Sequence, residues 1–258
     1  MPFLLATDPG DPGQANEDVA ALTTNGAVLL DGASAPAGID IGCEHGVAWH
    51  TRHLAGLLLA GLLGTDSLRT VLAQAITTMA ELHGPDCDQA NQEFPSATVI
   101  LVRLTGEQLD YLVLSDSVLL IRHANGTVST IADTRLDDLK TELGRDRSGA
   151  KHSVRTLRNT PGGFWTAGVD ARAADEALTG SLPLADVTGF AAMTDGATRG
   201  VEVFGSQTWE ACYLLACEKG PGALIDHVRE LEQADAEQRR YTRGKLHDDS
   251  TVVTWTHD

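Results

Sequence analysis

Aromatic residues are scarce in this sequence, since Phe, Tyr and Trp together make up 5% of its 258 residues. The core therefore has to be aliphatic, and a hydrophobic content of 42% is enough to build one. Long hydrophobic runs are lacking too. The most apolar stretch, Leu54 to Gly64, is too short to span a bilayer and predicts a buried helix. The N-terminus has no basic residue ahead of its short apolar run, so we expect no signal peptide.

Cysteine and basic side chains are also few. The four cysteines form no CxxC pair and have no His or Cys nearby at zinc-ligand spacing, which predicts reduced, mostly buried thiols in a cytoplasmic protein; they are Cys43, Cys87, Cys212 and Cys217. His50 and His53 are one helical turn apart, but no third ligand is evident, so surface or core roles are favoured. With 19 basic against 36 acidic residues, the net charge of -17 disfavours nucleic acid and anionic membranes as partners. Solubility is the simple explanation of this charge; the sharper one is that some carboxylates surround cations.

The patterns along the chain favour an α+β fold with antiparallel sheets, because strands come in hairpin-connected runs and helices in pairs. Asn-Gly at 25–26 and at 125–126 predicts two tight hairpins. Two helices are expected between residues 44 and 83, with Asp66 as the N-cap of the second. Further helices are predicted over 134–143, 170–178, 207–217 and 223–238. No linker or fixed-period repeat divides the chain, so we expect one domain over residues 1–258.

Acidic residues stand at the ends of five predicted strands. In chain order they are Asp18, Asp31, Asp116, Asp195 and the pair Asp248 and Asp249. Strands of one sandwich can bring their ends together, and carboxylates gathered there repel one another unless cations lie among them. Magnesium and manganese suit such an all-oxygen shell. The pattern therefore points to a divalent-metal site at one end of the sheets.

Two of these acids lie in stretches that echo each other. Ala27 to Ser34 reads AVLLDGAS, and Ala191 to Thr198 reads AAMTDGAT. A glycine after the acid lets the backbone turn sharply and lets a carbonyl oxygen approach an ion. Asp-Gly is also common in ordinary turns, so the echo alone leaves both interpretations open.

Six motifs in order resemble those of the metal-dependent Ser/Thr protein phosphatases, the PPM or type 2C family. They are NED at 16–18, DG at 31–32, SATVILV from 96, LSDS at 114–117, MTDG at 193–196 and HDDSTVV from 247. Each motif is weak alone, but their order and their span over nearly the whole chain are specific. The resemblance implies a four-layer α-β-β-α sandwich, in which two antiparallel sheets are flanked by helix pairs.

The resemblance also implies a two-metal centre holding Mn²⁺ or Mg²⁺. Asp31 would bridge the two ions, and Gly32 would offer its carbonyl oxygen to one of them. Asp195 and Asp248 would hold the second ion, and Asp116 would serve a third, weaker site found in many bacterial members.

Catalysis would follow from that centre. Asp18, with Glu17 beside it, would orient a water activated by the two ions, and this water would attack the phosphoryl group in line. No covalent enzyme intermediate is needed, so no Cys or Ser nucleophile is expected.

The sequence departs from the family pattern in three places. Gly13 stands where the family usually has an Arg that grips the phosphate, DGASAPAG lacks a frequent His, and SDSV replaces Gly-Asp-Ser-Arg. The nearest replacement for the missing Arg is Arg199, four residues after Asp195; the alternative is that Arg199 faces solvent or pairs with Glu202. The next candidates lie in the basic segment between Arg145 and Arg158.

These observations favour a free-standing, cytoplasmic catalytic domain that hydrolyses phosphoserine and phosphothreonine in a phosphorylated protein substrate. The retained metal acids argue against an inactive enzyme. Two alternatives stay open: a phosphatase fold that binds a partner and turns over poorly, favoured by Gly13, and a hydrolase of small phosphate esters that uses the same centre.

Overall fold

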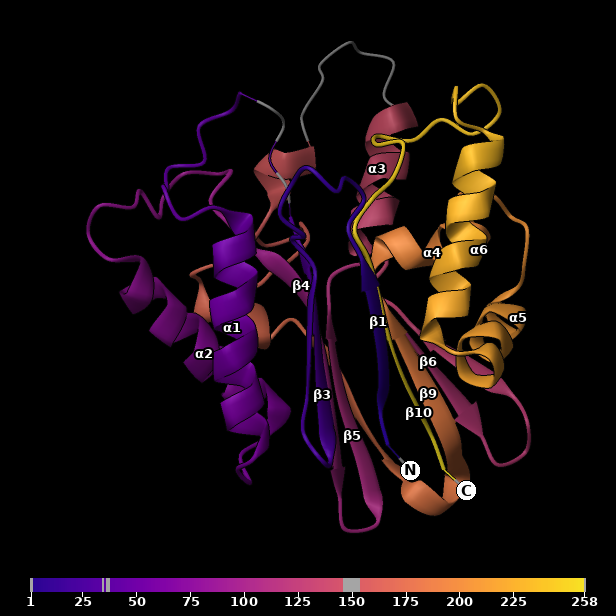
Figure 1. The fold of residues 1–258 in the computed structure, drawn as a ribbon. Coiled ribbons are helices and arrows are strands. Elements are labelled where there is room, and N and C mark those ends of the chain that lie inside the picture. Colours follow the sequence, from indigo (N-terminus) through magenta and orange to yellow (C-terminus); the bar gives the residue numbers. More distant parts are fainter. Residues whose placement is uncertain (1, 34, 36–37, 146–153, 258) are drawn as a thin grey trace.

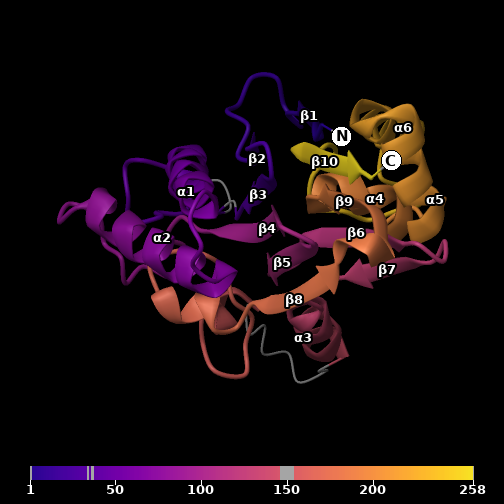
Figure 2. The same ribbon diagram turned by 90° about the horizontal axis from the view of Figure 1, so that it is seen from below.

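The computed structural model describes residues 2–33, 35, 38–145 and 154–257. Two antiparallel sheets pack face to face, with helices α1 and α2 on one side and α5 and α6 on the other (Figure 1). Seen from below, the same four layers follow one another across the molecule (Figure 2). The predicted α-β-β-α sandwich is confirmed.

Each sheet contains five strands. The first has the order β1-β10-β9-β6-β7, made of Leu4–Asp8, Ser250–Thr256, Val187–Met193, Val118–His123 and Val128–Ile131. The second has the order β2-β3-β4-β5-β8, made of Val19–Leu22, Gly26–Gly32, Ala97–Thr105, Gln108–Leu114 and Leu178–Pro183. Strands far apart in the chain thus become neighbours, because the N-terminal β1 pairs with the C-terminal β10.

Helices α1 and α2 cover the outer face of one sheet and α4, α5 and α6 that of the other, whereas α3 packs against the short helix Val154–Leu157. Their bounds are Val47–Leu62 for α1, Leu68–His83 for α2, Arg135–Arg145 for α3, Asp195–Glu202 for α4, Trp209–Leu214 for α5 and Pro221–Ala234 for α6. In α1 the buried side chains recur every three or four residues, as at Leu54, Leu58 and Leu62, so one face of the helix meets the sheet. This segment contains the apolar run that predicted a buried helix. None of the helices in the described residues is long and apolar enough to cross a membrane.

Three hydrophobic layers hold the sandwich together, and the two-residue period of the strands builds them. In β3, Val28 and Leu30 face α1 and α2, whereas Ala27 and Leu29 face the other sheet. Strand β10 divides in the same way, with Val252 toward α5 and α6. Both sheets are therefore buried on both faces, and their strand ends are the places where polar side chains gather.

Several local predictions need correction. The N-cap of α2 is Ser67, whose side chain accepts a hydrogen bond from the Thr70 amide, and not Asp66. The helix predicted over 170–178 is only a short 3₁₀ helix, Ala171–Ala174, followed by β8. Strand β8 pairs with β5 at the edge of its sheet, and its side chains are mostly exposed. It therefore lacks the apolar alternation that marks a strand in sequence.

Both predicted hairpins form, although only one uses positive φ. Gly126 has φ 87°, as the tight turn between β6 and β7 requires. Neither Asn25 nor Gly26 is in the left-handed region. That turn is closed instead by the Thr23 amide, which donates to the Gly26 carbonyl at 2.8 Å.

Candidate metal centre

Five strands deliver acidic residues to one end of the sandwich, as the sequence predicted. Asp18 directly precedes β2, Asp31 lies at the end of β3, and Asp116 lies between β5 and β6. Asp195 follows β9 and begins α4, and Asp248 lies just before β10. Four of these acids, Asp31, Asp116, Asp195 and Asp248, line one open cavity of about 290 Å³. Asp18 does not line the cavity; it is buried beside it.

The acids raise one another's pKa values. Burial raises the pKa of Asp31 well above its usual range, and repulsion from Asp195 and Asp18, and then from Asp116 and Asp248, adds to the shift. Burial also raises the pKa of Asp18 to about 8, against a hydrogen bond of 2.8 Å from the Thr194 hydroxyl to its Oδ2. Without added positive charge, these carboxylates cannot all stay ionised near neutral pH.

The pKa values of Asp195 and Asp116 are also raised. Asp195 is open to the cavity, yet the surrounding protein removes enough water to raise its pKa to about 6, and Asp248 and Asp116 contribute further repulsion. Burial raises the pKa of Asp116, whereas the Lys140 ammonium acts to lower it. The backbone amide of Asp195, at the N-terminus of α4, points at Asp31 Oδ2 from 3.4 Å. The first turn of α4 therefore joins the two echoing Asp-Gly stretches.

The glycines of these two stretches have a steric reason to be there. A Cβ atom on Gly196 would lie 1.9 Å from the carbonyl oxygen of Asp249, and one on Gly32 would lie 2.5 Å from a methyl of Val47. Neither glycine has a positive φ. Close approach of neighbouring segments therefore requires these glycines, rather than an unusual backbone turn.

Ser115 explains one departure from the family motif. It stands where the family has the glycine of Gly-Asp-Ser, and its φ is 68°, in the left-handed region that favours glycine. Its hydroxyl donates to Asp116 Oδ1 at 3.2 Å. The strained residue therefore contacts the acid next to it, and the backbone shape at this strand end is kept without glycine.

The two adjacent acids before β10 have different tasks. Asp249 accepts hydrogen bonds from the backbone amides of Gly10 at 2.9 Å and Glu17 at 2.7 Å, so it ties the N-terminal loop to β10. Asp248 faces the cavity and pairs with Arg199 at 2.9 Å and Lys245 at 2.7 Å. The geometry singles out Asp248 as the acid available to a cation in the cavity.

Arg199 is held by carboxylates behind the cavity. Its guanidinium contacts Glu232 at 2.5 Å and Asp248 at 2.9 Å, and the residue is only 6% exposed. The alternative considered from the sequence, a surface pair between Arg199 and Glu202, does not form. Arg199 pairs with Glu232 and Asp248 instead, and Glu202 accepts a hydrogen bond from the Thr198 hydroxyl. The phosphate role of Arg199 stays a prediction, and its contacts favour a role in positioning Asp248.

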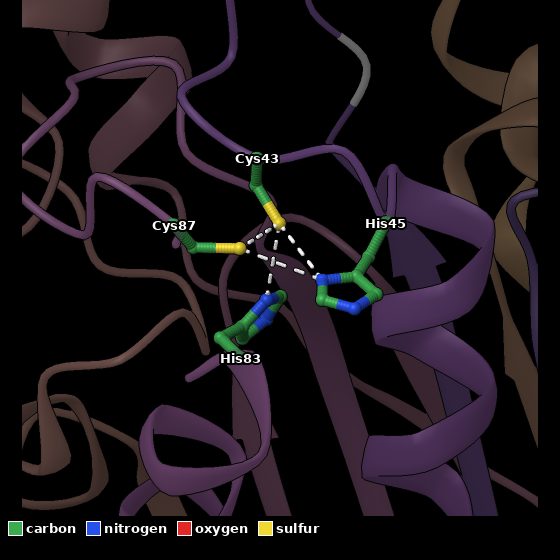
Figure 3. Close-up of side chains that lie close together, drawn as sticks. All are labelled: Cys43, His45, His83 and Cys87. Carbon is green, nitrogen blue, oxygen red and sulfur yellow. Dashed lines mark hydrogen bonds between the residues drawn. The ribbon is translucent and has the colours of Figure 1, made fainter. Parts of the chain in front are cut away.

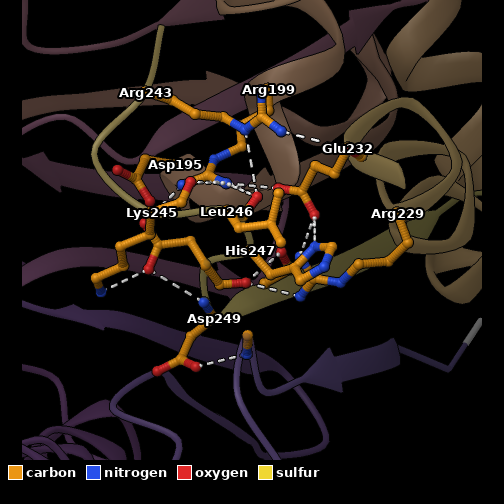
Figure 4. Close-up of polar contacts among 12 residues, drawn as sticks. Asp195, Arg199, Arg229, Glu232, Arg243, Lys245, Leu246, His247 and Asp249 are labelled. Carbon is orange, nitrogen blue, oxygen red and sulfur yellow. Dashed lines mark hydrogen bonds and ion pairs between the residues drawn. The ribbon is translucent and has the colours of Figure 1, made fainter. Parts of the chain in front are cut away.

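Glu232 is the centre of this network (Figure 4). It lies on α6, is fully buried, and contacts Arg199, Arg229 and the His247 ring at 2.5, 2.8 and 2.6 Å. Arg229 in turn donates to the Asp248 carbonyl at 2.7 Å and pairs with Asp8 at 2.8 Å. One buried carboxylate thus connects α6 to the loop that carries Asp248.

Other cationic side chains reach the cavity itself. Lys140 comes from α3, and Lys245 from the loop before β10. Arg155 lies in the short helix Val154–Leu157, and Arg158 directly follows this helix. Arg155 pairs with Glu93 at 2.5 Å. Arg147 and Lys151, also in the basic segment singled out from the sequence, lie outside the described residues. Gly13 lies in an exposed loop, where its amide donates to Asp11.

A family model described as Protein phosphatase 2C matches residues 11–212, well over half of the chain. The chain belongs to the protein phosphatase 2C family, so the resemblance found in the six motifs is confirmed. A comparison with curated proteins found no match.

Solved structures of bacterial phosphatases share the fold over the full chain. A bacterial serine phosphatase is 15% identical with a TM-score of 0.65, covering 100% of this chain and 98% of its own. Stp1 from Staphylococcus aureus is 13% identical with a TM-score of 0.58, covering 99% and 94%. The catalytic domain of the Ser/Thr phosphatase PstP, solved with two manganese ions, is 16% identical with a TM-score of 0.57, covering 98% and 96%. At these identities the likeness extends to the fold.

A second group of side chains contradicts the sequence-based view of the cysteines. Cys43 and Cys87 lie together with His45 and His83, and none of the four lines the acidic cavity. No cysteine was expected to have a His or Cys partner at ligand spacing. Within each pair, Cys43–His45 and His83–Cys87, the two residues are close in sequence. The pairs themselves are far apart, with 38 positions from His45 to His83, and the packing of α1 against α2 brings them together.

Proposed function

We propose that this chain is a manganese- or magnesium-dependent phosphoprotein phosphatase that hydrolyses phosphoserine and phosphothreonine. The observation that carries the proposal is the meeting of four carboxylates from distant strand ends on one cavity. Membership of the phosphatase family supports the reaction class. The two manganese ions of the related PstP domain support the choice of ions.

The residues present fit such ions. The donor set is all oxygen, as hard divalent cations prefer, and the raised pKa values of the acids mark a place where positive charge is needed. When bound, two such ions supply the positive charge that stabilises the phosphoryl oxygens and activates water. Asp31 would hold both ions, the Gly32 carbonyl would hold one of them, Asp195 and Asp248 would hold the second, and Asp116 would hold a third. Asp248 keeps one lone pair for a cation, because Oδ1 accepts from Lys245 and from the Asp249 amide, whereas among the described residues Oδ2 accepts a hydrogen bond from Arg199 alone.

The protein's own side chains would do the remaining work. Asp18, fixed by the Thr194 hydroxyl beside the cavity, would orient the attacking water. Arg155 and Lys245 line the same cavity, and their positive charges would attract the phosphate dianion while they keep their contacts with Glu93 and Asp248. This arrangement would do the task that the family usually assigns to the Arg missing at Gly13.

Activity measurements test the proposal directly. We expect manganese-dependent hydrolysis of both para-nitrophenyl phosphate and a phosphothreonine peptide, with the larger kcat/KM for the peptide. Turnover of the small ester alone would replace the proposal with a small-ester hydrolase. No turnover of either compound at saturating manganese would leave a binding module as the better account.

Manganese is expected to raise the melting temperature, and to do so more at pH 8 than at pH 6. In the metal-free fold the pKa values of Asp18 and Asp195 are raised to about 8 and about 6. In the unfolded chain the pKa of Asp is about 3.9, so above that pH the folded state binds more protons than the unfolded chain. The stability of the metal-free protein therefore falls as the pH rises from about 4 toward 8. Manganese at 100 times its Kd adds about 2.7 kcal/mol, or roughly 5–10 °C for a domain of this size.

Thermal melts after manganese removal and add-back, at both pH values, measure this effect. Asp195→Asn serves as the control, since losing a ligand should shrink the manganese-induced shift. Equal midpoints with and without manganese at pH 8 would contradict the metal centre.

A further inference from the structure

A cluster of two thiols and two imidazoles lies at the start of α1 and the end of α2, outside the acidic cavity (Figure 3). Cys43 Sγ lies 3.2 Å from Nδ1 of His45 and 3.2 Å from Nδ1 of His83. Cys87 Sγ lies 3.4 Å from His45 Nδ1 and 2.6 Å from Cys43 Sγ. All four atoms lie within 4.8 Å of one another. Each side chain therefore offers one soft or borderline donor to a common centre.

The hydrogen bonds behind the cluster fix the tautomer of His83. The Ala167 carbonyl can only accept, so Nε2 of the fully buried His50, at 2.9 Å, must carry the proton. His50 Nδ1 is then an acceptor, so His83 Nε2, 3.0 Å away, donates to it. The neutral His83 ring is left with its lone pair on Nδ1, the atom that faces Cys43. A hydrogen-bond acceptor behind the ring that fixes its tautomer is the usual support of a metal-bound histidine, and His50 Nδ1 takes that place here.

The surroundings enclose and orient the remaining ligands. Trp49 stacks on the His45 ring with centroids 4.2 Å apart, and Phe94 meets the His83 ring edge-on at 4.7 Å. Gly42 and Gly46, at φ 68° and 76°, bracket the Cys43–His45 segment and let both of its side chains turn inward. His83 and Cys87 are buried and Cys43 and His45 are half-buried, so these rings limit the access of water to the centre without sealing it.

We propose that Cys43, His45, His83 and Cys87 bind one zinc ion in a structural site. Two thiolates and two imidazoles in a closed tetrahedral set are the typical ligands of structural zinc, whereas the ions suited to the acidic cavity prefer oxygen. With Zn–S bonds of about 2.3 Å, the two sulfurs would lie about 3.8 Å apart, so they would separate by about 1 Å from their present positions. A disulfide between Cys43 and Cys87 is the competing use of the same sulfurs.

The ion would tie two loops to the sheet that carries Asp31. The 38–46 loop already contacts the loop after α2, since the Asp88 amide donates to the Gly42 carbonyl at 2.7 Å. His50 continues the connection to Ala167, which pairs with Ala97 at the start of β4. Ala97 is the register partner of Gly32. A chain of contacts thus connects His83, one of the four ligands, to the end of β3 that carries Asp31.

Metal analysis of the full chain tests the site, and its readouts do not depend on phosphatase activity. We expect about one tightly held zinc ion per chain, retained after dialysis against excess manganese. Cys87→Ser should lose it, whereas Cys217→Ser, which removes a cysteine outside the cluster, should keep it. The double variant Asp31→Asn, Asp195→Asn should also keep its zinc, which separates this site from the acidic centre.

Cobalt substitution and thiol counting complete the test. Cobalt(II) in the wild-type protein should give the intense visible bands of a tetrahedral site and a thiolate-to-cobalt charge-transfer band, whether or not Cys87→Ser folds. Ellman's reagent, applied to the protein unfolded in chelator without reductant, should find all four thiols. Absence of the charge-transfer band would overturn the proposal. Finding two thiols instead of four would also overturn it, in favour of the disulfide.

Discussion

Asp31→Asn is expected to abolish phosphatase activity while leaving the fold intact. Asp31 lies on the cavity among the other acids, and it receives repulsion from Asp18, Asp116, Asp195 and Asp248, so it is the residue nearest to the electrostatic centre of the site. Asparagine keeps the size of the side chain but removes the charge needed to bridge two dications. A loss of several kcal/mol of transition-state stabilisation corresponds to a fall in kcat of about 1,000-fold or more.

The same substitution should stabilise the metal-free protein at pH 8. The pKa of Asp31 is raised well above its usual range, so at pH 8 folding must either protonate this carboxyl or bury it charged, and the neutral amide has neither cost. A paired measurement of kcat and of the metal-free melting temperature therefore distinguishes loss of the site from loss of the fold. Asp66→Asn, which changes an exposed residue before α2 that does not line the cavity, is the matched control. Normal turnover in Asp31→Asn would contradict the assignment of Asp31 as the bridging ligand.

The order of the strand-end acids allowed the fold and much of the candidate site to be predicted from the sequence. The buried strands β3 and β9 are nearly continuous apolar runs, and Asp31 lies at the end of one and Asp195 just after the other, so their placement follows from local pattern. The edge strand β8 has no such run, because it is exposed. The N-cap of α2 was misplaced by one residue, because neighbouring Asp66 and Ser67 are both good caps and only the hydrogen bond to Thr70 decides between them.

The contacts that depend on tertiary packing were not visible in the sequence. The Cys43–His45 pair precedes α1 and the His83–Cys87 pair begins at the last residue of α2, so the whole α1–α2 hairpin separates them in the sequence and their spacing matches no short zinc motif. Arg199 was correctly placed near Asp195 in the chain, but Glu232, its buried partner, is 33 residues further on and carries no local signal. Long-range pairing of charges is set by the packing of α4 against α6, which the sequence pattern does not encode locally.

Glu232→Ala is expected to destabilise the protein strongly and to weaken manganese binding. Glu232 is fully buried and contacts Arg199, Arg229 and His247, so its removal leaves two guanidinium groups without their shared carboxylate. Breaking a buried ion pair by removing one partner costs about 3–5 kcal/mol. For a domain of this size that is a fall in melting temperature of roughly 6–20 °C. Arg199 would also be free to shift, and with it the carboxylate of Asp248.

Three variants separate these effects. Glu230→Ala changes an exposed glutamate on the same helix and should alter the melting temperature by only a degree or two, or about 0.5 kcal/mol. Glu232→Gln keeps the packing but removes the charge, so it should retain more stability than Glu232→Ala. Its manganese Kd, measured well below the melting temperature, should still rise by about 10- to 100-fold, as when an outer-shell partner of a metal ligand is lost. An unchanged manganese Kd in a folded Glu232→Gln would show that the Arg199 network stabilises the fold without positioning Asp248.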